Sequence, residues 1–420
     1  MGLTLTEVND SPAAPFGTLP PSLSEELRTE LTAFRRDLHR HPETARKEFR
    51  TTEQVRARLE QAGLAPRVLP GGTGLICDIG DIGSDPGGAI GSTDGSAPAR
   101  RRLALRADLD ALPVPDTKTA EYRSTVPGTA HACGHDVHTT VVLGAGLVLA
   151  GLDRAGRLPR PVRLVFQAAE EVMPGGALDA IKARVLDGVE RILAVHCDPK
   201  VDVGRIGLRS GPITSAADRL LLTLDGPGGH SARPHLTTDL VMATAKLATE
   251  LPLVLTRRAD PRSGLSLVWG RIHAGHAANV IPQHAELEGT VRCLDLAAWH
   301  EAPDLVHEVI DQVAAMYRAK CQITYQRGVP PVVNEAVSTE LLRDAMTARY
   351  GVHAIEDTEQ SLGGEDFSWY LERIPGAMAR LGVRPVGDTV KRDLHQGDFD
   401  VDEGAIAVGV ELFTAAALLS

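Results

Sequence analysis

Three short apolar runs, each followed by polar side chains of the kind used in catalysis, constrain the fold of this chain most strongly. The runs cover residues 103–107, 162–166 and 192–195. Each run is short, is rich in β-prone residues and predicts a strand. The polar residues that follow the runs are Asp108 and Asp110, Glu170 and Glu171, and His196. Because ligands in open α/β sheets bind beyond the carboxyl ends of the strands, the pattern predicts an α/β sheet with one shared crevice.

The length of 420 residues exceeds what one hydrophobic core usually serves, so we expect two domains. Helical patterns between and before the runs complete a βαβ arrangement. From about residue 215 the expected order becomes β-α-β-β-α-β, the split βαβ arrangement of a smaller α+β domain. The predicted parts are a loose arm at 1–21, a catalytic α/β domain at 22–214 and 330–420 with a flexible surface loop at 81–101, and an inserted domain at 215–329.

Composition and charge exclude several classes of function. The formal net charge is −11 and the isoelectric point is near 5.8, which disfavours nucleic acid as a partner because phosphate binding requires clustered Lys and Arg. No window approaches the ~18 uninterrupted apolar residues that span a bilayer, and the first residues lack a secretory pattern, so we expect no membrane partner. The five cysteines are odd in number and scattered, which suits a reducing cytoplasm.

The segment HACGHDVH at residues 131–138, together with the pair Glu170-Glu171, carries the strongest chemical signal. Thiolate, imidazole and carboxylate groups are the side chains that bind borderline-soft divalent metals. Cys133 and His135 lie two residues apart, so in an extended segment they share one face and reach a common metal. Adjacent carboxylates repel each other, and a metal offsets that repulsion. One glutamate can then act as a ligand while the other faces the reacting water.

Two more histidines, His196 and His395, are weak signals individually. Structural zinc sites usually draw their ligands from two tight pairs, whereas these candidates come from distant segments, so the dispersal favours a catalytic site. Other interpretations stay open at this point. Cys133 can be a small buried residue beside a hydrogen-bonded His135, and the glutamate pair can be a solvated acidic turn. A thiol hydrolase that uses Cys133 with His135 would leave the acidic pair unexplained.

Nine segments in a fixed order resemble the signatures of one family. They are RRDLHRHPE at 35–43, LRADLDALPV at 105–114, HACGHDVHTT, FQAAEE, HCDP, GPGGHSARPH, ANVIP, GTVR and GGEDF. With this collinear set the chain after residue 30 resembles the metallo-aminoacylase family, which includes hippurate hydrolases, N-acyl-amino-acid amidohydrolases and plant auxin-conjugate amidohydrolases. The resemblance implies an α/β zinc-peptidase-like catalytic domain with a mixed central sheet flanked by helices. It also implies that a smaller, ferredoxin-like dimerisation domain interrupts this catalytic domain.

The resemblance implies a site with two divalent metal ions, and the mixed ligand set is compatible with zinc, manganese, cobalt or nickel. The implied ligands are Cys133, which bridges the two metals, and His135, Glu171, His196 and His395. Glu170 is then the general base that takes a proton from water and passes it to the leaving amine. His230 is implied to reach the active site of a partner subunit and to stabilise the oxyanion there. A homodimer through the inserted domain follows from that role.

The implied reaction is the hydrolysis of the amide bond of an N-acyl-L-amino acid. Asn279 and Arg292 resemble family residues near the substrate and are candidates for binding its carboxylate. For Arg292, a surface ion pair on a strand is an equally open interpretation. The candidates for positions behind the ligands are Asp110, Asp136 and His138.

Alternatives to this reaction stay within reach of the same residues. An N-acetyl-diaminopimelate-type deacetylase or a dipeptidase would use the same chemistry on another amide. A non-catalytic metal-binding scaffold would be expected to lack the free glutamate, and Glu170 is present. Cys197 and Asp198, next to His196, depart from the family's usual apolar or aromatic pair, which leaves the preference for substrate and metal open.

Overall fold

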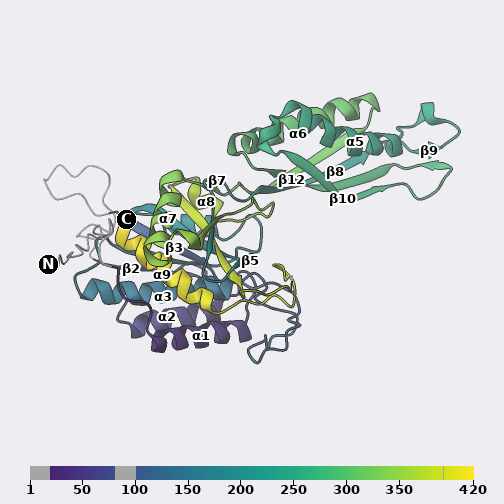
Figure 1. Cartoon of the computed structure of the whole chain (residues 1–420). Coiled ribbons are helices and arrows are strands. Elements are labelled where there is room, and N and C mark those ends of the chain that lie inside the picture. Colours follow the sequence, from purple (N-terminus) through teal and green to yellow (C-terminus); the bar gives the residue numbers. More distant parts are fainter. Residues whose placement is uncertain (1–18, 81–100, 391) are drawn as a thin grey trace, which may run out of the picture.

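A computed structural model describes residues 19–80, 101–390 and 392–420 of the chain. Its larger part is built on an eight-stranded sheet with the order β1-β2-β4-β3-β5-β16-β6-β15 (Figure 1). The strands are β1 Arg67–Val68, β2 Leu75–Ile79, β4 Val162–Gln167, β3 Arg102–Asp108, β5 Val189–Asp202, β16 Gly376–Arg384, β6 Ile206–Leu208 and β15 Ile355–Asp357. Strands β4, β3, β5 and β16 run parallel, whereas β2 and β6 pair antiparallel with their neighbours β4 and β16. The expected mixed α/β sheet is thus confirmed.

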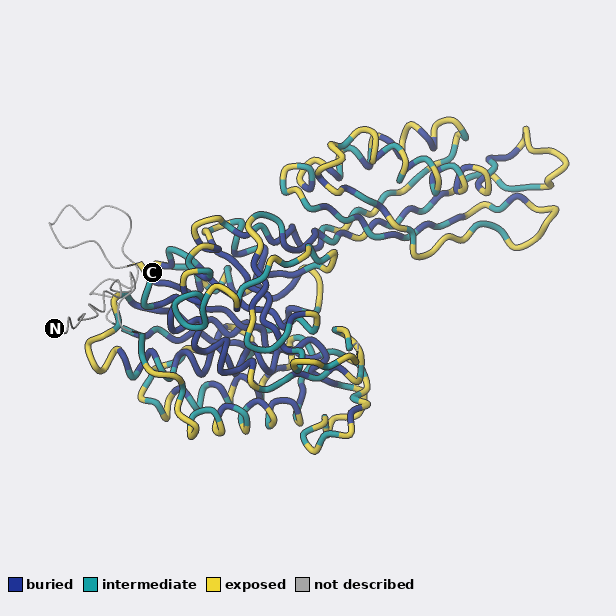
Figure 2. Tube along the Cα trace, in the orientation of Figure 1, coloured by how far each residue is buried: buried dark blue, intermediate teal, exposed yellow. Residues whose placement is uncertain are grey.

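Helices cover both faces of this sheet. One face carries α1 Glu25–Arg40, α2 Phe49–Gln61, α3 His135–Arg154, α7 Ala336–Tyr350 and α9 Gly404–Leu419, and the other carries the short helices α4 Ala177–Lys182 and α8 Ser368–Leu371. Among the described residues, α3 is the one helix long and apolar enough to cross a membrane, but it is buried in the core. Figure 2 shows this burial as a dark centre around the sheet.

Alternation along the strands divides the sheet into an apolar face and a face that becomes polar at one end. In β3, Leu103 and Leu105 pack in the core that contains α3, whereas Ala104 packs with α4 and α8. Arg106 and Asp108 follow Ala104 on that second face. The polar end of this face therefore lies at the carboxyl ends of the parallel strands, where a ligand crevice is expected.

A smaller unit, called here the inserted unit, spans residues 216–329 and projects from the main sheet (Figure 1). Its antiparallel sheet has the order β10-β12-β8-β13 and its own hydrophobic core. Its elements are β8 Ala216–Asp225, β9 Gly229–His230, α5 Leu240–Arg258, β10 Ser266–Ala274, β11 Val280–Ile281, β12 His284–Cys293, α6 Leu296–Met316 and β13 Lys320–Val329. The remaining short elements are β7 Gly211–Pro212, β14 Val333–Asn334, η1 Pro234–Leu236, η2 Pro261–Ser263 and η3 Val352–Ala354.

Two local expectations were wrong in physically informative ways. Gly134 has φ 87° and caps α3, so Cys133 and His135 sit on a helix entry and not in an extended segment. His196 lies inside the long strand β5 and does not follow its end. Residues 1–18 of the predicted arm and 81–100 of the predicted loop lie outside the described residues.

Candidate metal centre

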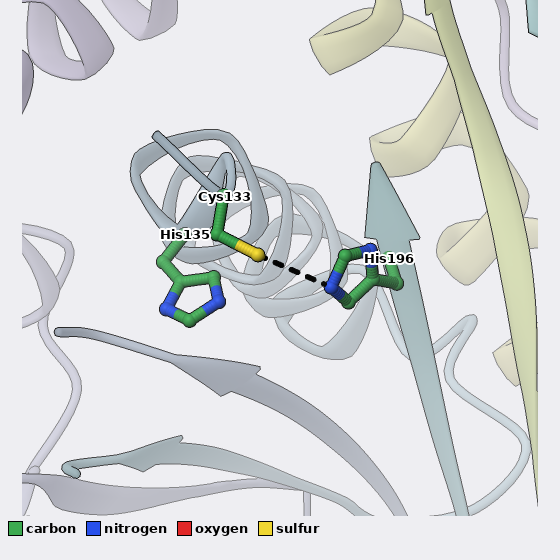
Figure 3. Close-up of side chains that lie close together, drawn as sticks. All are labelled: Cys133, His135 and His196. Atoms are coloured by element: carbon green, nitrogen blue, oxygen red, sulfur yellow. Dashed lines mark hydrogen bonds between the residues drawn. The ribbon is translucent and has the colours of Figure 1, made fainter. Parts of the chain in front are cut away.

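The structure brings together all five side chains that the resemblance implies as metal ligands. Cys133 precedes α3 and His135 begins it, Glu171 follows β4, His196 lies in β5, and His395 lies in the loop before α9. Cys133 Sγ is 3.5 Å from His196 Nε2, the contact drawn in Figure 3. Glu171 Oε1 is 3.8 Å from His135 Nε2 and 3.5 Å from His395 Nε2.

These five residues form two overlapping groups. The ligand atoms of Cys133, His135 and His196 lie within 4.8 Å of one another, and so do those of Cys133, Glu171 and His395. Cys133 is the member that both groups share. The five residues thus offer two candidate groups of metal ligands that have Cys133 in common.

The chemistry of the cluster fits a divalent metal. His135 Nε2 and Glu171 Oε1 are buried and have no hydrogen-bond partner among the described residues. Burial raises the pKa of Glu171 to about 7, and burial together with the charge of Glu171 raises the pKa of the Cys133 thiol. Buried groups whose anionic forms are disfavoured in this way fit a site whose cations stabilise those forms.

Backbone contacts orient the histidine ligands. His135 Nδ1 is 2.9 Å from the carbonyl oxygen of Asp110, and His196 Nδ1 is 2.8 Å from that of Cys197. Since a carbonyl only accepts, each Nδ1 carries the proton, which leaves Nε2 free to bind a metal. The backbone N–H of His395 donates to Ala132 O at 2.8 Å, which holds the last ligand beside Cys133.

Two buried carboxylates hold the segment that carries the glutamate pair. Asp110 Oδ1 and Oδ2 accept the backbone N–H groups of Glu170 and Glu171 at 3.0 and 2.9 Å. Glu48 Oε1 accepts the N–H of the preceding residue, Ala169, at 2.8 Å. Three consecutive amides are thus fixed by side chains from two other parts of the chain.

The other two residues expected behind the ligands make different contacts. His138 Nδ1 lies 2.6 Å from Asp108 Oδ1, and His138 Nε2 accepts the backbone N–H of Cys197 at 2.8 Å. Asp136 pairs with Arg35 and His39, each at 2.7 Å, on the side of α1. His138 therefore supports the segment after His196, whereas the Asp136 contacts tie α3 to α1.

Glu170 lies at the edge of the cluster, with Oε2 3.9 Å from His135 Nε2. Burial and the negative charges of Glu365 and Glu171 raise its pKa well above the ordinary range. A buried carboxylate with a perturbed pKa is a candidate for general acid–base chemistry. Behind it, the buried guanidinium of Arg106 lies 3.2 Å from Glu365 and 2.8 Å from Asp366.

His230 and Asn279 lie apart from the cluster in this chain (Figure 1), whereas Arg292 contacts the larger part. His230 pairs with Val280 on the ribbon of β9 and β11, and the N–H of the next residue, Ser231, donates to Asn279 O at 3.1 Å. Figure 1 places β9 at the end of the inserted unit that points away from β5. Arg292 donates a hydrogen bond to the carbonyl oxygen of Leu362, which joins β12 to the larger part.

Sequence reasoning marked Asp108 only as a polar residue of the catalytic kind after a strand. It assigned no role to several other buried charged residues near the site, namely Glu48, Arg106, Glu365, Asp366 and Arg380. For two of these residues, the sequence itself contains a pattern that could have identified them. Arg106 in LALRAD and Arg380 in GAMARLGV each interrupt an otherwise apolar strand, and a charge buried there requires a partner. No comparable pattern marks Glu48, because its partner Ala169 is distant in sequence.

Comparisons with known proteins show what this chain is similar to. The family model described as Peptidase family M20/M25/M40 matches residues 104–419. The N-acetyl-L-cysteine deacetylase of Bacillus subtilis is 35% identical over 387 residues, which cover 92% of this chain and 87% of that protein. The crystal structure of Bacillus subtilis YxeP, described as a dinuclear metal-binding peptidase of the M20 family, has a TM-score of 0.78 and 32% identity, and covers 94% of this chain and 99% of that one.

A longer protein of Rhodococcus jostii, to which the name glutamate–cysteine ligase 2-3 is provisionally attached, is 47% identical over 386 residues. The match covers 92% of this chain, and the chain spans 46% of that protein's length. The motifs, the fold and these relatives all indicate the same family. The chain belongs to peptidase family M20/M25/M40 and is a metal-dependent hydrolase of the amidohydrolase and peptidase type.

Proposed function

We propose that this protein uses two divalent metal ions to hydrolyse N-acyl-L-amino acids to a carboxylic acid and an amino acid. The observation that carries the proposal is the double group of ligand atoms that shares Cys133, with Glu170 at its edge. The ligands would be Cys133, His135, Glu171, His196 and His395. Relatives named N-acetylcysteine deacetylase, at 34 and 35% identity, favour a short acyl group.

When bound, the two metals supply Lewis-acid activation of water and of the amide carbonyl. Glu170 takes the proton of the attacking water and returns it to the leaving amine. Asp110 and Glu48 hold the backbone of the glutamate segment, so that Glu170 is presented to the reacting atoms without rearrangement. Arg292 binds the carboxylate of the amino acid by exchanging its contact with Leu362, and Asn279, which lies on the same ribbon as His230, contributes to the site of a second copy.

His230 completes the site of a second copy of the chain. It lies on an exposed ribbon far from the chain's own cluster, which favours action on a partner subunit. The edge strand β10 supports pairing between copies, because Val268 and Ile272 on it are 66% and 49% exposed. In such a homodimer His230 donates to the developing oxyanion.

Peptide cleavage is the second candidate, because relatives named thermostable carboxypeptidase are 31 and 32% identical to the chain. A deacetylase of the N-acetyl-diaminopimelate type would use the same groups. For the compartment, we propose the cytoplasm, since all five cysteines are free thiols and four of them are buried.

The test combines elemental analysis of the purified protein with a screen of N-acetyl, N-benzoyl and longer acyl amino acids and of dipeptides. We expect two metal ions per chain and turnover of at least one N-acyl amino acid. Glu170→Gln should keep both metals and lose about 100-fold or more in kcat, whereas Cys133→Ser should lose metal. Full activity of Glu170→Gln, or turnover of dipeptides alone, would contradict the proposal.

A further inference from the structure

Arg380 lies beside the metal centre on strand β16. The register of β16 against the parallel strand β5 places Arg380 opposite His196. Met378, two residues earlier, packs in the same core as Ala194 of β5, whereas Ala379 packs on the other face of the sheet. Alternation therefore puts Arg380 and His196 on one face, at the polar end described above.

The guanidinium of Arg380 has no partner among the described residues, although the residue as a whole is largely buried. Only 6% of the residue is exposed, and among the described residues it makes no hydrogen bond and no ion pair within 4.0 Å. The other buried arginines of the described chain all form ion pairs, namely Arg35, Arg102, Arg106 and Arg163. Arg380 is thus the exception among five, although burying a guanidinium without a counter-charge is costly.

Three ionisable groups act electrostatically on Arg380, but among the described residues none of them forms a hydrogen bond or an ion pair with it. These groups are Asp198 of β5, Glu365 of the GGEDF segment and the Cys133 thiol. Asp198 uses Oδ1 to accept the backbone N–H of Lys200 at 2.8 Å, and Glu365 uses Oε1 to accept that of Phe367 at 2.9 Å. A planar guanidinium with free donors recognises a carboxylate through two parallel hydrogen bonds.

We propose that Arg380 binds a second carboxylate of the substrate, so that the enzyme prefers N-acyl amino acids that carry one acidic group besides the α-carboxylate. This inference rests on the proposed N-acyl-amino-acid hydrolysis. The second carboxylate can belong to the acyl group, as in an N-succinyl amino acid, or to the amino-acid side chain, as in an N-acetyl acidic amino acid. In either case Arg380 determines specificity, whereas Glu170 and the ligands carry out the reaction.

The experiment measures kcat/KM of the metal-loaded enzyme on two matched pairs. N-succinyl-L-alanine is compared with N-pentanoyl-L-alanine, and N-acetyl-L-glutamate with N-acetyl-L-glutamine. We expect the acidic member of one pair to be preferred by about tenfold or more, and Arg380→Met to abolish that ratio. Arg380→Lys should restore it in part, since an ammonium attracts a carboxylate without the bidentate geometry. The pair that responds identifies which carboxylate is bound.

Two further measurements test whether Arg380→Met loses the preference for the acidic substrate for a reason other than carboxylate binding. Metal content per chain should be equal in the wild type and both variants, and succinate should bind the wild type more tightly than Arg380→Met by calorimetry, whereas pentanoate should not distinguish them. Arg219→Met, on the open face of the inserted sheet, is the matched surface control and should keep the ratio. Equal kcat/KM within both pairs for the wild type, or a ratio kept in Arg380→Met, would overturn the inference alone. Turnover of none of the four compounds would overturn this inference, and it would overturn the proposed function as well if the wider screen of N-acyl amino acids were also negative.

Discussion

Oε1 of the buried Glu48 accepts the backbone N–H of Ala169 at 2.8 Å. Ala169 has φ 61°, a left-handed conformation that costs a residue with a Cβ about 1–3 kcal/mol and persists when surrounding contacts hold it. The carbonyl of Ala169 accepts the N–H of Gly176 at 2.8 Å, so both polar groups of its backbone are bound. The turn that leads into the glutamate pair is therefore fixed by a residue from the segment before α2.

Glu48→Ala should loosen this turn and misplace Glu170. We expect kcat to fall about tenfold or more with a smaller change in KM, because positioning acts mainly on the transition state. Glu48→Gln keeps an acceptor oxygen and should retain more activity. Glu43→Ala is the matched control: its carboxylate accepts the N–H groups of Arg50 and Thr51 at the start of α2, so stability should fall while kcat is kept. A normal kcat in Glu48→Ala would remove this role.

Glu48 also predicts a pH dependence of stability. Burial, aided by the charge of Asp110, raises its pKa from 4.5 to about 7. Between these two values the folded protein binds more protons than the unfolded chain, so this group contributes stability at low pH that is lost as pH rises through 7. The free energy of unfolding of Glu48→Gln relative to wild type should therefore increase by ~1.4 kcal/mol per pH unit within that window. Urea unfolding at pH 5, 6 and 7 measures the difference, and a difference independent of pH would contradict the assignment.

The fold class could be predicted from the sequence because periodicity is a local signal, whereas the full set of candidate ligands came from the family resemblance. The strands around Leu105, Leu164 and Leu193 are buried apolar runs, and each occurs in the main sheet. The local geometry at Cys133 could not be predicted from spacing, since it depends on the positive φ of Gly134. A side chain on Gly134 would meet Cys197 Sγ at 2.7 Å, so close packing of β5 selects glycine there.

The contacts of Glu48 and Arg380 could not be predicted from the sequence for a different reason. Both act on residues far along the chain. The packing of the segment before α2 brings Glu48 to Ala169, and the pairing of β16 with β5 brings Arg380 to the neighbourhood of His196. A single sequence carries the identity of such charges but not their partners. The contacts of His230 are harder still to predict from one sequence, because its proposed partner is another copy of the chain.

Arg106 should contribute strongly to the stability of the catalytic part. Its guanidinium is buried and forms ion pairs with Asp108 at 2.6 Å, with Asp366 at 2.8 Å and with Glu365 at 3.2 Å. Arg106→Met would leave three buried carboxylates without a cation, which should lower the free energy of unfolding by about 3 kcal/mol or more. The exposed pair of Arg219 with Glu288 is the comparison, and Arg219→Met should change it by about 1 kcal/mol or less. Urea denaturation of both variants measures the contrast, and equal effects would show that the buried network is not required.

Action of His230 on the partner subunit predicts complementation between two inactive proteins. His230→Ala lacks the donor and Glu170→Gln lacks the base, so each homodimer should be nearly inactive. In a mixed dimer, the chain with His230→Ala keeps its own Glu170 and receives His230 from the partner, which restores one complete site. After dissociation and reassembly of an equal mixture, about a quarter of the wild-type activity should return.

The control for that experiment is the same mixture without reassembly, which should stay inactive while the homodimers persist. A double variant that carries both substitutions on one chain, mixed with wild type, should give no activity beyond what the wild-type chains supply. If His230 acted within its own chain, neither chain of the mixed dimer could hold a complete site. Reassembly would then restore nothing, even though gel filtration and native mass spectrometry showed that mixed dimers had formed.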